Sequence, residues 1–384
     1  MEKDYVSSRY AHGHPSMLGD LGAQAERFDD LINFSLGDPD LKTDDRIIDA
    51  AAAAAHAGCT HYTHPRGLPE LRQGIRDFYR QEFGFAVADE ELTVTTSACQ
   101  GMWAVMQAVL DPGDEVIVPE PYFSPYKDQI EMAGGVLVPL PTCEEENFEV
   151  NVNRIEGLIG PHTRAILFNT PNNPTGSCFG RAALEVIADV ARRHDLLVIA
   201  DDIYTIFSYA GPFIPIGTLP GMAQRTVTVR SFSKDYCMTG WRIGYIIAPP
   251  QVIEAVRLVN EANVYSAPSP SQCAAIAALR LRREVQPPII AEFRRRTEAA
   301  FAAIGEISYL SVLPPQGSIY LFVNIKRTGL TSMEFTRQLL MRYHVFVVPG
   351  NAFGDSGEGY VRLALTMGVE RIRAAFDRLP KDHF

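Results

Sequence analysis

The amino-acid sequence predicts an α/β fold in which a mainly parallel seven-stranded sheet is flanked by helices and joined by a smaller α+β domain. Three observations predict it: a series of short β-rich runs, helical patterns between several of them, and a change of pattern near position 285. Several runs are apolar nearly throughout, as strands covered on both faces must be. The runs are LTVTT (92–96), EVIVP (115–119), VLVPL (136–140), AILFN (165–169), LLVIA (196–200), TVTVR (226–230) and IGYIIA (243–248).

Helical patterns separate members of this series. Apolar residues recur at helical spacing over 102–110, and a second helical pattern covers 182–194. This alternation favours strands joined by crossover helices, and hence a largely parallel sheet. Before the series, positions 43–58 are typical of a helix with polar N-cap candidates and a glycine, Gly58, just past its end.

The pattern changes after the seventh run. A long basic helical stretch covers 292–304, and alternating strand patterns follow at SIYLFVNI (318–325) and HVFVVPG (344–350). We therefore expect a large domain over 45–284 and a small domain made of 1–44 and 285–384.

Composition bounds the function. A chain of 384 residues with 46% hydrophobic residues is long enough for two packed domains. Its formal net charge of -11 provides no general basic field, so we expect neither nucleic acid nor a membrane as partner. The start of the chain shows no basic cap with an apolar stretch, and no apolar run approaches the ~18 residues of a membrane helix. We expect a cytoplasmic protein.

Cysteine and histidine spacing gives no sign of a metal site. His61 and His64 flank Tyr62 in a loop with proline and glycine rather than on a helix, and we assign no metal to them. The six cysteines form no C-x-x-C pair, and we expect them to be reduced and mostly buried. They are at positions 59, 99, 143, 178, 237 and 273.

Polar groups follow four of the apolar runs. In parallel sheets ligands bind beyond the carboxyl ends of the strands, so these positions should meet at one edge. Taken singly, each segment is more typical of a turn, a helix cap or a solvated loop. Together they place a phosphate cradle, an amide, a carboxylate, a phenol and an amine side by side. The segments are Ser97-Ala98-Cys99, TPNNPTG (170–176), Asp201-Asp202-Ile203-Tyr204 and Ser231-Phe232-Ser233-Lys234.

Pyridoxal phosphate (PLP) needs this set of groups. A lysine amine condenses with its aldehyde, an acid keeps its pyridine nitrogen protonated, and several donors hold its phosphate. The protonated ring withdraws electrons from Cα of a bound amino acid, which makes the Cα proton removable.

Longer strings carry a specific resemblance. NNPTG (172–176), ADDIY (200–204), SFSK (231–234) and GWRIGY (240–245), in this order and spacing, resemble class I/II aminotransferases of PLP fold type I. The bacterial aspartate and aromatic aminotransferases are the most similar branch. The likeness runs from about position 30 onward and includes SLGDPD (35–40), HYTHPRGLPELR (61–72), VVPGNAFG (347–354) and YVRLAL (360–365).

The resemblance implies roles around the cofactor ring. Lys234 is implied as the Schiff-base lysine and general base, and Asp201 as the partner of the pyridine nitrogen. Tyr204 and Asn173 are implied to hydrogen-bond the ring hydroxyl, with Lys234, Asp201 and Tyr204 as the catalytic group. Phe123 falls where the family places an aromatic residue over the ring, although an aromatic side chain at a strand end is often only core.

Other roles concern the phosphate. The resemblance implies that it takes the backbone N–H groups of Ala98 and Cys99, the Ser231 hydroxyl and the Arg242 guanidinium. Ser97 stands where the family often has glycine, and its small size fits the same turn.

Two further positions concern the substrate and the partner subunit. Arg362 is implied to pair with the substrate's α-carboxylate, assisted by Asn173 and the backbone at Gly37. Tyr62 resembles a tyrosine that reaches the phosphate of the other subunit, which implies a homodimer.

The implied reaction is a ping-pong transamination in which an L-amino acid gives its amino group to a 2-oxo acid, with 2-oxoglutarate as the expected acceptor. Carbon–sulfur lyases and aminocyclopropane-carboxylate synthases share the same parts, and a cofactor-binding regulatory domain is a third hypothesis. Cys99 occupies a position where related aspartate aminotransferases can hold a lysine for the substrate's distal carboxylate. We therefore expect a relaxed donor range, unless Arg66 reaches the partner's pocket and substitutes for that lysine.

Overall fold

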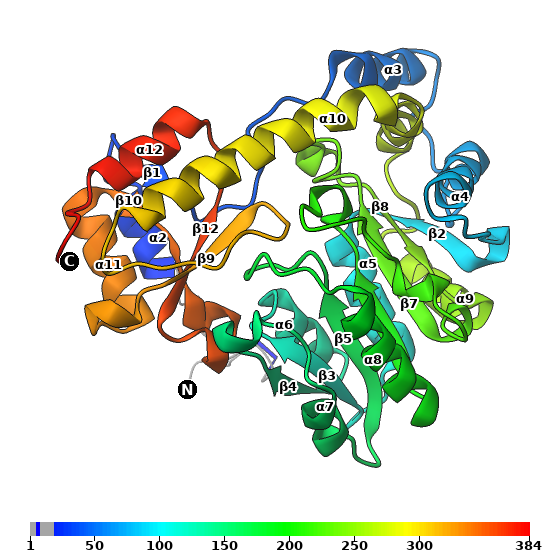
Figure 1. Cartoon of the computed structure of the whole chain (residues 1–384). Coiled ribbons are helices and arrows are strands. Elements are labelled where there is room, and N and C mark those ends of the chain that lie inside the picture. Colours follow the sequence, from blue (N-terminus) through cyan, green and yellow to red (C-terminus); the bar gives the residue numbers. More distant parts are fainter. Residues whose placement is uncertain (1–4, 8–18) are drawn as a thin grey trace.

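All seven predicted strands form, and together they make one sheet in the computed structural model, which describes residues 5–7 and 19–384 (Figure 1). The strand order is β2-β8-β7-β6-β5-β3-β4. β8 runs antiparallel to β2 and β7, and the other neighbours pair in parallel. The bounds are β2 Leu92–Thr95, β3 Glu115–Glu120, β4 Val136–Pro141, β5 Thr163–Asn169, β6 Leu197–Asp201, β7 Thr226–Ser231 and β8 Gly244–Ile247.

Helices cover both faces of this sheet, which explains why its strands are apolar nearly throughout. Within β3, Val116 and Val118 pack in a cluster with α5 and α9, whereas Ile117 between them packs in a cluster with α8. Successive side chains of a strand point to opposite faces, so both sets must be apolar. The covering helices are α5 Ala98–Val109, α6 Pro125–Met132, α7 Val152–Leu158, α8 Arg181–Arg193 and α9 Pro250–Asn263.

A second group of elements has its own apolar core. Phe34, Leu321 and Phe335 belong to a buried cluster drawn from the N-terminal and C-terminal parts of the chain. β1 pairs in parallel with β10, and β11, β12 and β9 form an antiparallel sheet. The bounds are α2 Gly19–Ala25, β1 Ile32–Asn33, β9 Tyr320–Asn324, α11 Ser332–Tyr343, β10 Val345–Phe346, β11 Val348–Pro349, β12 Tyr360–Ala364 and α12 Val369–Asp377.

One long helix, α10 (Ser269–Gly305), runs between the two groups (Figure 1). The sequence pattern predicted only its last part, because Pro287 and Pro288 normally end a helix and here lie inside it. α10 continues through position 285 without a break. The division into a large domain over 45–284 and a small domain made of 1–44 and 285–384 stays a prediction. Residues 1–4 and 8–18 of that small domain lie outside the described residues.

The remaining helices surround the first half of α10. α3 (Asp45–His56) and α4 (Pro69–Phe83) both pack on it, and α3 begins at the predicted polar cap, with the Asp44 side chain accepting from the Arg46 N–H. Short 3₁₀ helices occupy the loops at Asp89–Glu91, Glu144–Glu146, Thr205–Phe207, Ile216–Thr218, Ala223–Arg225, Thr239–Trp241, Lys326–Thr328, Gly350–Phe353 and Asp355–Gly357.

The expectation for the cysteines is wrong in one respect. All six carry free thiols, but only Cys237 is buried, and Cys99 is exposed at the start of α5. Cys99 lies at the start of a helix at the edge of a cavity, where the Gln129 side chain of α6 contacts its sulfur at 3.5 Å but leaves the residue exposed. Across residues 5–7 and 19–384, no helix is both long and apolar enough to cross a membrane.

Gly244 tests how tightly β8 packs against the turn before α5. A Cβ at this position would lie 2.7 Å from the Ala98 nitrogen and 2.7 Å from the Arg230 carbonyl oxygen, both of which are backbone atoms. We expect Gly244→Ala to lower the free energy of unfolding by ~1–3 kcal/mol, measured by urea denaturation. Gly305→Ala is the control, because a Cβ there meets open space. Equal midpoints for the two variants would contradict this packing.

Candidate active site

The carboxyl ends of β5, β6 and β7 bring the predicted residues to one edge of the sheet. Asn169 is in register with Asp201, and Asp201 with Val229, two residues before Ser231. A cavity of about 310 Å³ opens at this edge. Nine of the predicted site residues line it: Gly37, Ser97, Ala98, Cys99, Phe123, Asp201, Ser231, Lys234 and Arg242.

Asp201 is a buried carboxylate with one oxygen in use. Its Oδ2 accepts a hydrogen bond of 2.5 Å from the Tyr126 hydroxyl, whereas Oδ1 is buried without a partner among the described residues. Burial raises the pKa of Asp201 to about 7, against the lowering effect of Tyr126 and of a backbone N–H. A cationic N–H donor placed at Oδ1 would restore the charged form, and a protonated pyridine nitrogen is such a donor.

Hydrogen-bond donors gather at the start of α5 and the end of β7. The Ser97 side chain caps α5 by accepting from the Gln100 N–H at 3.0 Å. The N–H groups of Ala98 and Cys99 have no intrahelical acceptors, because they lie in the first turn of the helix. The Ser231 hydroxyl and the exposed Arg242 line the same cavity. Backbone N–H groups at a helix N-terminus, a hydroxyl and a guanidinium suit a phosphate.

The amine of Lys234 lies between the sheet edge and an N-terminal loop. Its Nζ donates to the Gly37 carbonyl oxygen. The Thr239 hydroxyl donates to the Asp38 carboxylate at 2.6 Å and holds this loop beside the cavity. Gly37 is required here, because a Cβ would lie 2.0 Å from the Tyr320 hydroxyl oxygen.

Arg362 is a buried cation on β12. Its Nη1 donates to Asn173 Oδ1 at 3.1 Å and its Nη2 to the Ser35 carbonyl oxygen, whereas Nε has no partner among the described residues. Burial lowers the pKa of Arg362. Its guanidinium carbon lies 4.6 Å from the ring centre of Tyr320. The free N–H and the uncompensated charge suit a carboxylate.

Tyr204 and Asn173 do not line the cavity but contact Tyr320 and Arg362, respectively. The Tyr204 hydroxyl is 2.9 Å from that of Tyr320, and burial raises the pKa of Tyr204 well above its usual value. The Asn173 N–H donates to Asn169 Oδ1 at 2.8 Å, which holds the NNPTG turn against β5. Asn169 also donates to the Asp201 carbonyl oxygen at 2.6 Å, so the predicted amide is linked to Asp201 through Asn169.

Sequence reasoning missed Tyr126 and Tyr320. Tyr126 follows Phe123 by three residues, and their rings meet edge to face at 5.5 Å. That spacing at the start of α6 was the available signal for Tyr126. Tyr320 belongs to a segment recognised only as a strand, and its partner Tyr204 is 116 residues away, so nothing local indicated the contact.

Two predicted positions, Tyr62 and Arg66, do not line the cavity, whereas a third, Cys99, does. Tyr62 is 84% exposed, and its ring meets that of Tyr265 edge to face at 5.3 Å. Arg66 is engaged on its own chain, because its guanidinium bonds the Asp89 carboxylate at 3.0 Å and the Asp89 carbonyl oxygen at 2.6 Å. Partial burial in the cavity wall raises the pKa of the Cys99 thiol, which is therefore neutral near pH 7.

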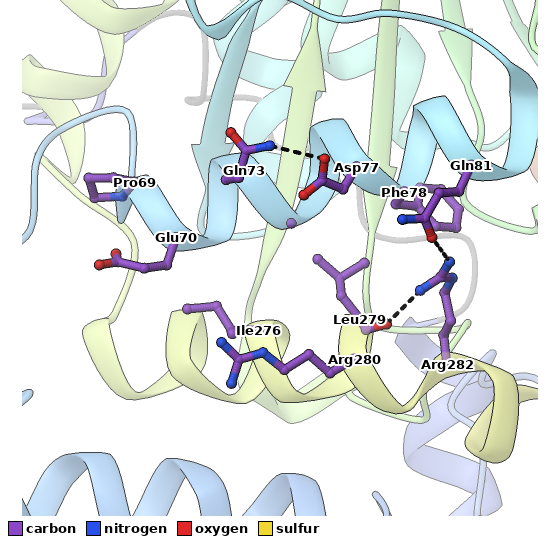
Figure 2. A pocket seen from close by; sticks show the side chains of 11 residues that line it. Pro69, Glu70, Gln73, Asp77, Phe78, Gln81, Ile276, Leu279, Arg280 and Arg282 are labelled. Atoms are coloured by element: carbon purple, nitrogen blue, oxygen red, sulfur yellow. Dashed lines mark hydrogen bonds between the residues drawn. The ribbon is translucent and has the colours of Figure 1, made fainter.

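A larger cavity, of about 600 Å³, lies between α4 and α10 (Figure 2). Several of its polar side chains bond their neighbours, as Gln73 does with Asp77 at 3.0 Å and Arg282 with Gln81 at 2.6 Å. No lysine lines it, and its side chains do not converge on one point. Within the described ranges, no group of three His, Cys, Asp or Glu residues is placed to hold a metal.

The fold and this cavity define an α/β enzyme of PLP fold type I, with a lysine, a buried acid and several hydrogen-bond donors at one sheet edge. The chain belongs to the family described as aminotransferase class I and II, whose sequence profile matches residues 29–379. The fold class and the family resemblance are thus confirmed, and the chain is a PLP-dependent transaminase.

Individual relatives agree over nearly the full length. The chain is 38% identical to an aspartate aminotransferase of Pyrococcus abyssi and 36% identical to aromatic-amino-acid aminotransferase 2 of Thermococcus litoralis, each over 380 residues that cover 98% of this chain and 97% of the relative. A solved aspartate aminotransferase from Rhizobium meliloti is 32% identical, with a TM-score of 0.94 and 98% of each chain covered. These transaminase names do not favour the lyase alternative.

The buried Asp201 carboxylate makes the stability of the cofactor-free protein depend on pH. Its folded pKa of about 7 lies above the unfolded value of ~3.9, so stability falls as pH rises from about 4 to 7. We expect Asp201→Asn to match wild type near pH 4 and to exceed it at pH 8 by on the order of 2–4 kcal/mol. Urea denaturation of the cofactor-free proteins measures the difference.

The control for this comparison is Asp195→Asn, because the Asp195 side chain is 92% exposed. Its free energy of unfolding should track wild type at both pH values. If Asp201→Asn likewise shows no gain at pH 8, burial does not penalise the Asp201 charge.

Proposed function

We propose that this chain moves the amino group of an L-amino acid to a 2-oxo acid by a ping-pong mechanism, with pyridoxal 5'-phosphate as cofactor and 2-oxoglutarate as acceptor. The observation that carries the proposal is the buried, unpaired Oδ1 of Asp201 in the cavity that also holds Lys234. A carboxylate oxygen without a donor is costly in a folded protein unless a ligand completes it.

The residues present fit the cofactor group by group. Lys234 supplies the amine that joins the aldehyde, and Asp201 supplies the acceptor for the ring N–H. Phe123 lines the cavity beside Tyr126 and would cover one face of the ring. The donors at Ala98, Cys99, Ser231 and Arg242 would hold the phosphate, with Ser97 capping the helix behind them.

When bound, pyridoxal phosphate supplies an electron-withdrawing ring that makes the Cα proton of an amino acid removable. The chain's own residues would then bind, orient and move protons. Arg362 would bind the α-carboxylate through its free N–H, with Asn173 holding the guanidinium in place. Tyr204 would donate to the ring hydroxyl. The Lys234 amine, once displaced by the substrate, would take the Cα proton, and the Gly37 loop would exclude water from it.

We also propose that the active unit is a homodimer. Tyr62 is exposed, and it does not line the cavity that holds the phosphate donors of its own chain. Its exposed ring beside the half-exposed Tyr265 is suited to contact with a second copy, in which Tyr62 would reach the phosphate.

The cavity wall supports a relaxed donor range. Its described cations are Lys234 and Arg242, and both are assigned to the cofactor. Cys99 is neutral, and Arg66 is paired with Asp89. Among the described residues that line the cavity, no cation is therefore left for a distal carboxylate, whereas Leu36 and Met102 offer apolar contact.

Two measurements test the proposal. Mixed with one amino donor and no acceptor, the holoenzyme should release about one equivalent of 2-oxo acid per site and then stop, as a half-reaction must. Continued release of pyruvate and ammonia would indicate lyase chemistry instead.

For the donor range, we expect kcat/KM values with 2-oxoglutarate for aspartate, alanine, leucine, methionine and phenylalanine to lie within ~10²-fold of one another. An advantage of ~10³ for aspartate would contradict this, because it requires ~4 kcal/mol of side-chain recognition. Cys99→Lys should raise kcat/KM for aspartate by ~10-fold and leave that for leucine unchanged, with Cys99→Ser as the matched neutral control.

A further inference from the structure

Tyr320 is buried at the start of β9 and touches several parts of the site at once. Only 3% of the residue is exposed. Its hydroxyl lies 2.9 Å from that of Tyr204, and the rings of the two tyrosines meet edge to face at 5.6 Å. Its ring faces the guanidinium carbon of Arg362 at 4.6 Å. Its hydroxyl oxygen also fills the space beside Gly37, next to the Lys234 amine.

Two backbone features hold Tyr320 in this place. β9 pairs with β12, so that Tyr320 is in register with Ala364. Arg362 is in register with Phe322, two residues after Tyr320. The NNPTG turn abuts it as well, because a Cβ on Gly176 would lie 3.0 Å from the Tyr320 carbonyl oxygen. The side chain is therefore fixed by the small sheet and by the turn that carries Asn173.

We propose that Tyr320 is a positioning residue that acts through its two neighbours: its hydroxyl donates to Tyr204, and its ring supports Arg362. This inference rests on the proposed function, in which Tyr204 serves the ring hydroxyl of the cofactor and Arg362 the substrate's α-carboxylate.

The hydroxyl part follows from counting protons. The Tyr204 hydroxyl has one proton, and if that proton is donated to the ring hydroxyl oxygen, its own oxygen is free to accept. The Tyr320 hydroxyl is placed to donate to it. Two hydroxyls in series polarise one another, so each donates more strongly than it would alone. Tyr320 thereby strengthens the stabilisation of negative charge on the ring oxygen.

The charged and titratable groups around Tyr204 are compatible with this series of two hydroxyl donors. Tyr320, Asp201 and Arg362 act on it from β9, β6 and β12, and Tyr126 faces it from α6. Burial raises the pKa of Tyr204 well above its usual value, so the phenol keeps its proton and remains a donor.

The ring part concerns the buried cation. Burial lowers the pKa of Arg362, and Tyr320 and Tyr204 act in the opposite direction. The negative face of an aromatic ring attracts a guanidinium, most strongly where water is excluded. The Tyr320 ring therefore helps to keep Arg362 charged and oriented for a carboxylate. The hydroxyl and ring contributions are separable by substitution.

The first test follows the pH dependence of the holoenzyme's visible absorbance, which reports the protonation of the nitrogen that joins the cofactor to Lys234. Weaker stabilisation of the ring oxygen raises this pKa. We expect Tyr320→Phe to raise it by ~0.5 or more, because one donor in the hydroxyl series is lost. Tyr309→Phe is the matched control, since the Tyr309 hydroxyl donates to the Pro380 carbonyl oxygen outside the cavity. A Tyr320→Phe profile equal to the control would overturn the hydroxyl role.

A double-mutant comparison asks whether Tyr320 acts through Tyr204. Tyr204→Phe should raise the same pKa at least as much, and adding Tyr320→Phe to it should change nothing further. Additive shifts would overturn the proposed series. This comparison also holds if one single variant is less stable, because the spectra report only folded, loaded enzyme.

The second test separates the ring from the hydroxyl. Spectral titration with an α-methyl amino acid, which has no Cα proton to lose, measures binding without turnover. We expect Tyr320→Phe to keep its Kd within ~2-fold and Tyr320→Leu to weaken it ~10-fold, because only the latter removes the aromatic face from Arg362. Equal Kd values for the two variants would overturn the ring role. If wild type itself shows no titrating band and no transamination, the proposed function fails; if wild type shows both, only the inference is at stake.

Discussion

Asp201 ends β6 inside the protein, with one carboxylate oxygen bonded to Tyr126 and the other bonded to nothing in the described chain. Removing a carboxylate from water costs several kcal/mol unless donors replace the water. Arg362 presents the opposite case, a buried guanidinium with a free Nε. The site therefore holds two buried charges of opposite sign, each short of one partner. A ligand that carries a cationic N–H at one end and a carboxylate at the other, such as the cofactor joined to an amino acid, would satisfy both.

The backbone fixes these two groups on different sheets. The parallel register of β5, β6 and β7 brings Asn169, Asp201 and Ser231 to one edge, and Gly244 lets β8 lie close enough to the turn before α5 to complete the phosphate side. The antiparallel pair β9 and β12 supplies Tyr320 and Arg362 from the other side. Binding of the cofactor with an amino acid would therefore connect the seven-stranded sheet to the sheet that contains β9 and β12.

Much of this was readable from the sequence, because two-sided burial makes parallel strands apolar and because site residues follow strand ends. Lys234 and Asp201 are predicted in this way, and both line one cavity of the structure. The full length of α10 could not be predicted, because proline normally ends a helix and only rarely lies inside one. Tyr126 and Tyr320 were missed because their contacts join residues 75 and 116 positions apart. The role of Tyr62 depends on a second copy of the chain, so its assignment stays a prediction.

The central claim is that Lys234 alone holds the cofactor. The chain has six lysines, at positions 3, 42, 127, 234, 326 and 381, so the claim is open to direct mapping. Borohydride reduction of the holoenzyme fixes the cofactor to the amine that carries it, and peptide mapping by mass spectrometry then locates the modified residue. We expect one modified peptide, spanning SFSK at 231–234. Cofactor reduced onto any other lysine, or onto none, would contradict the account.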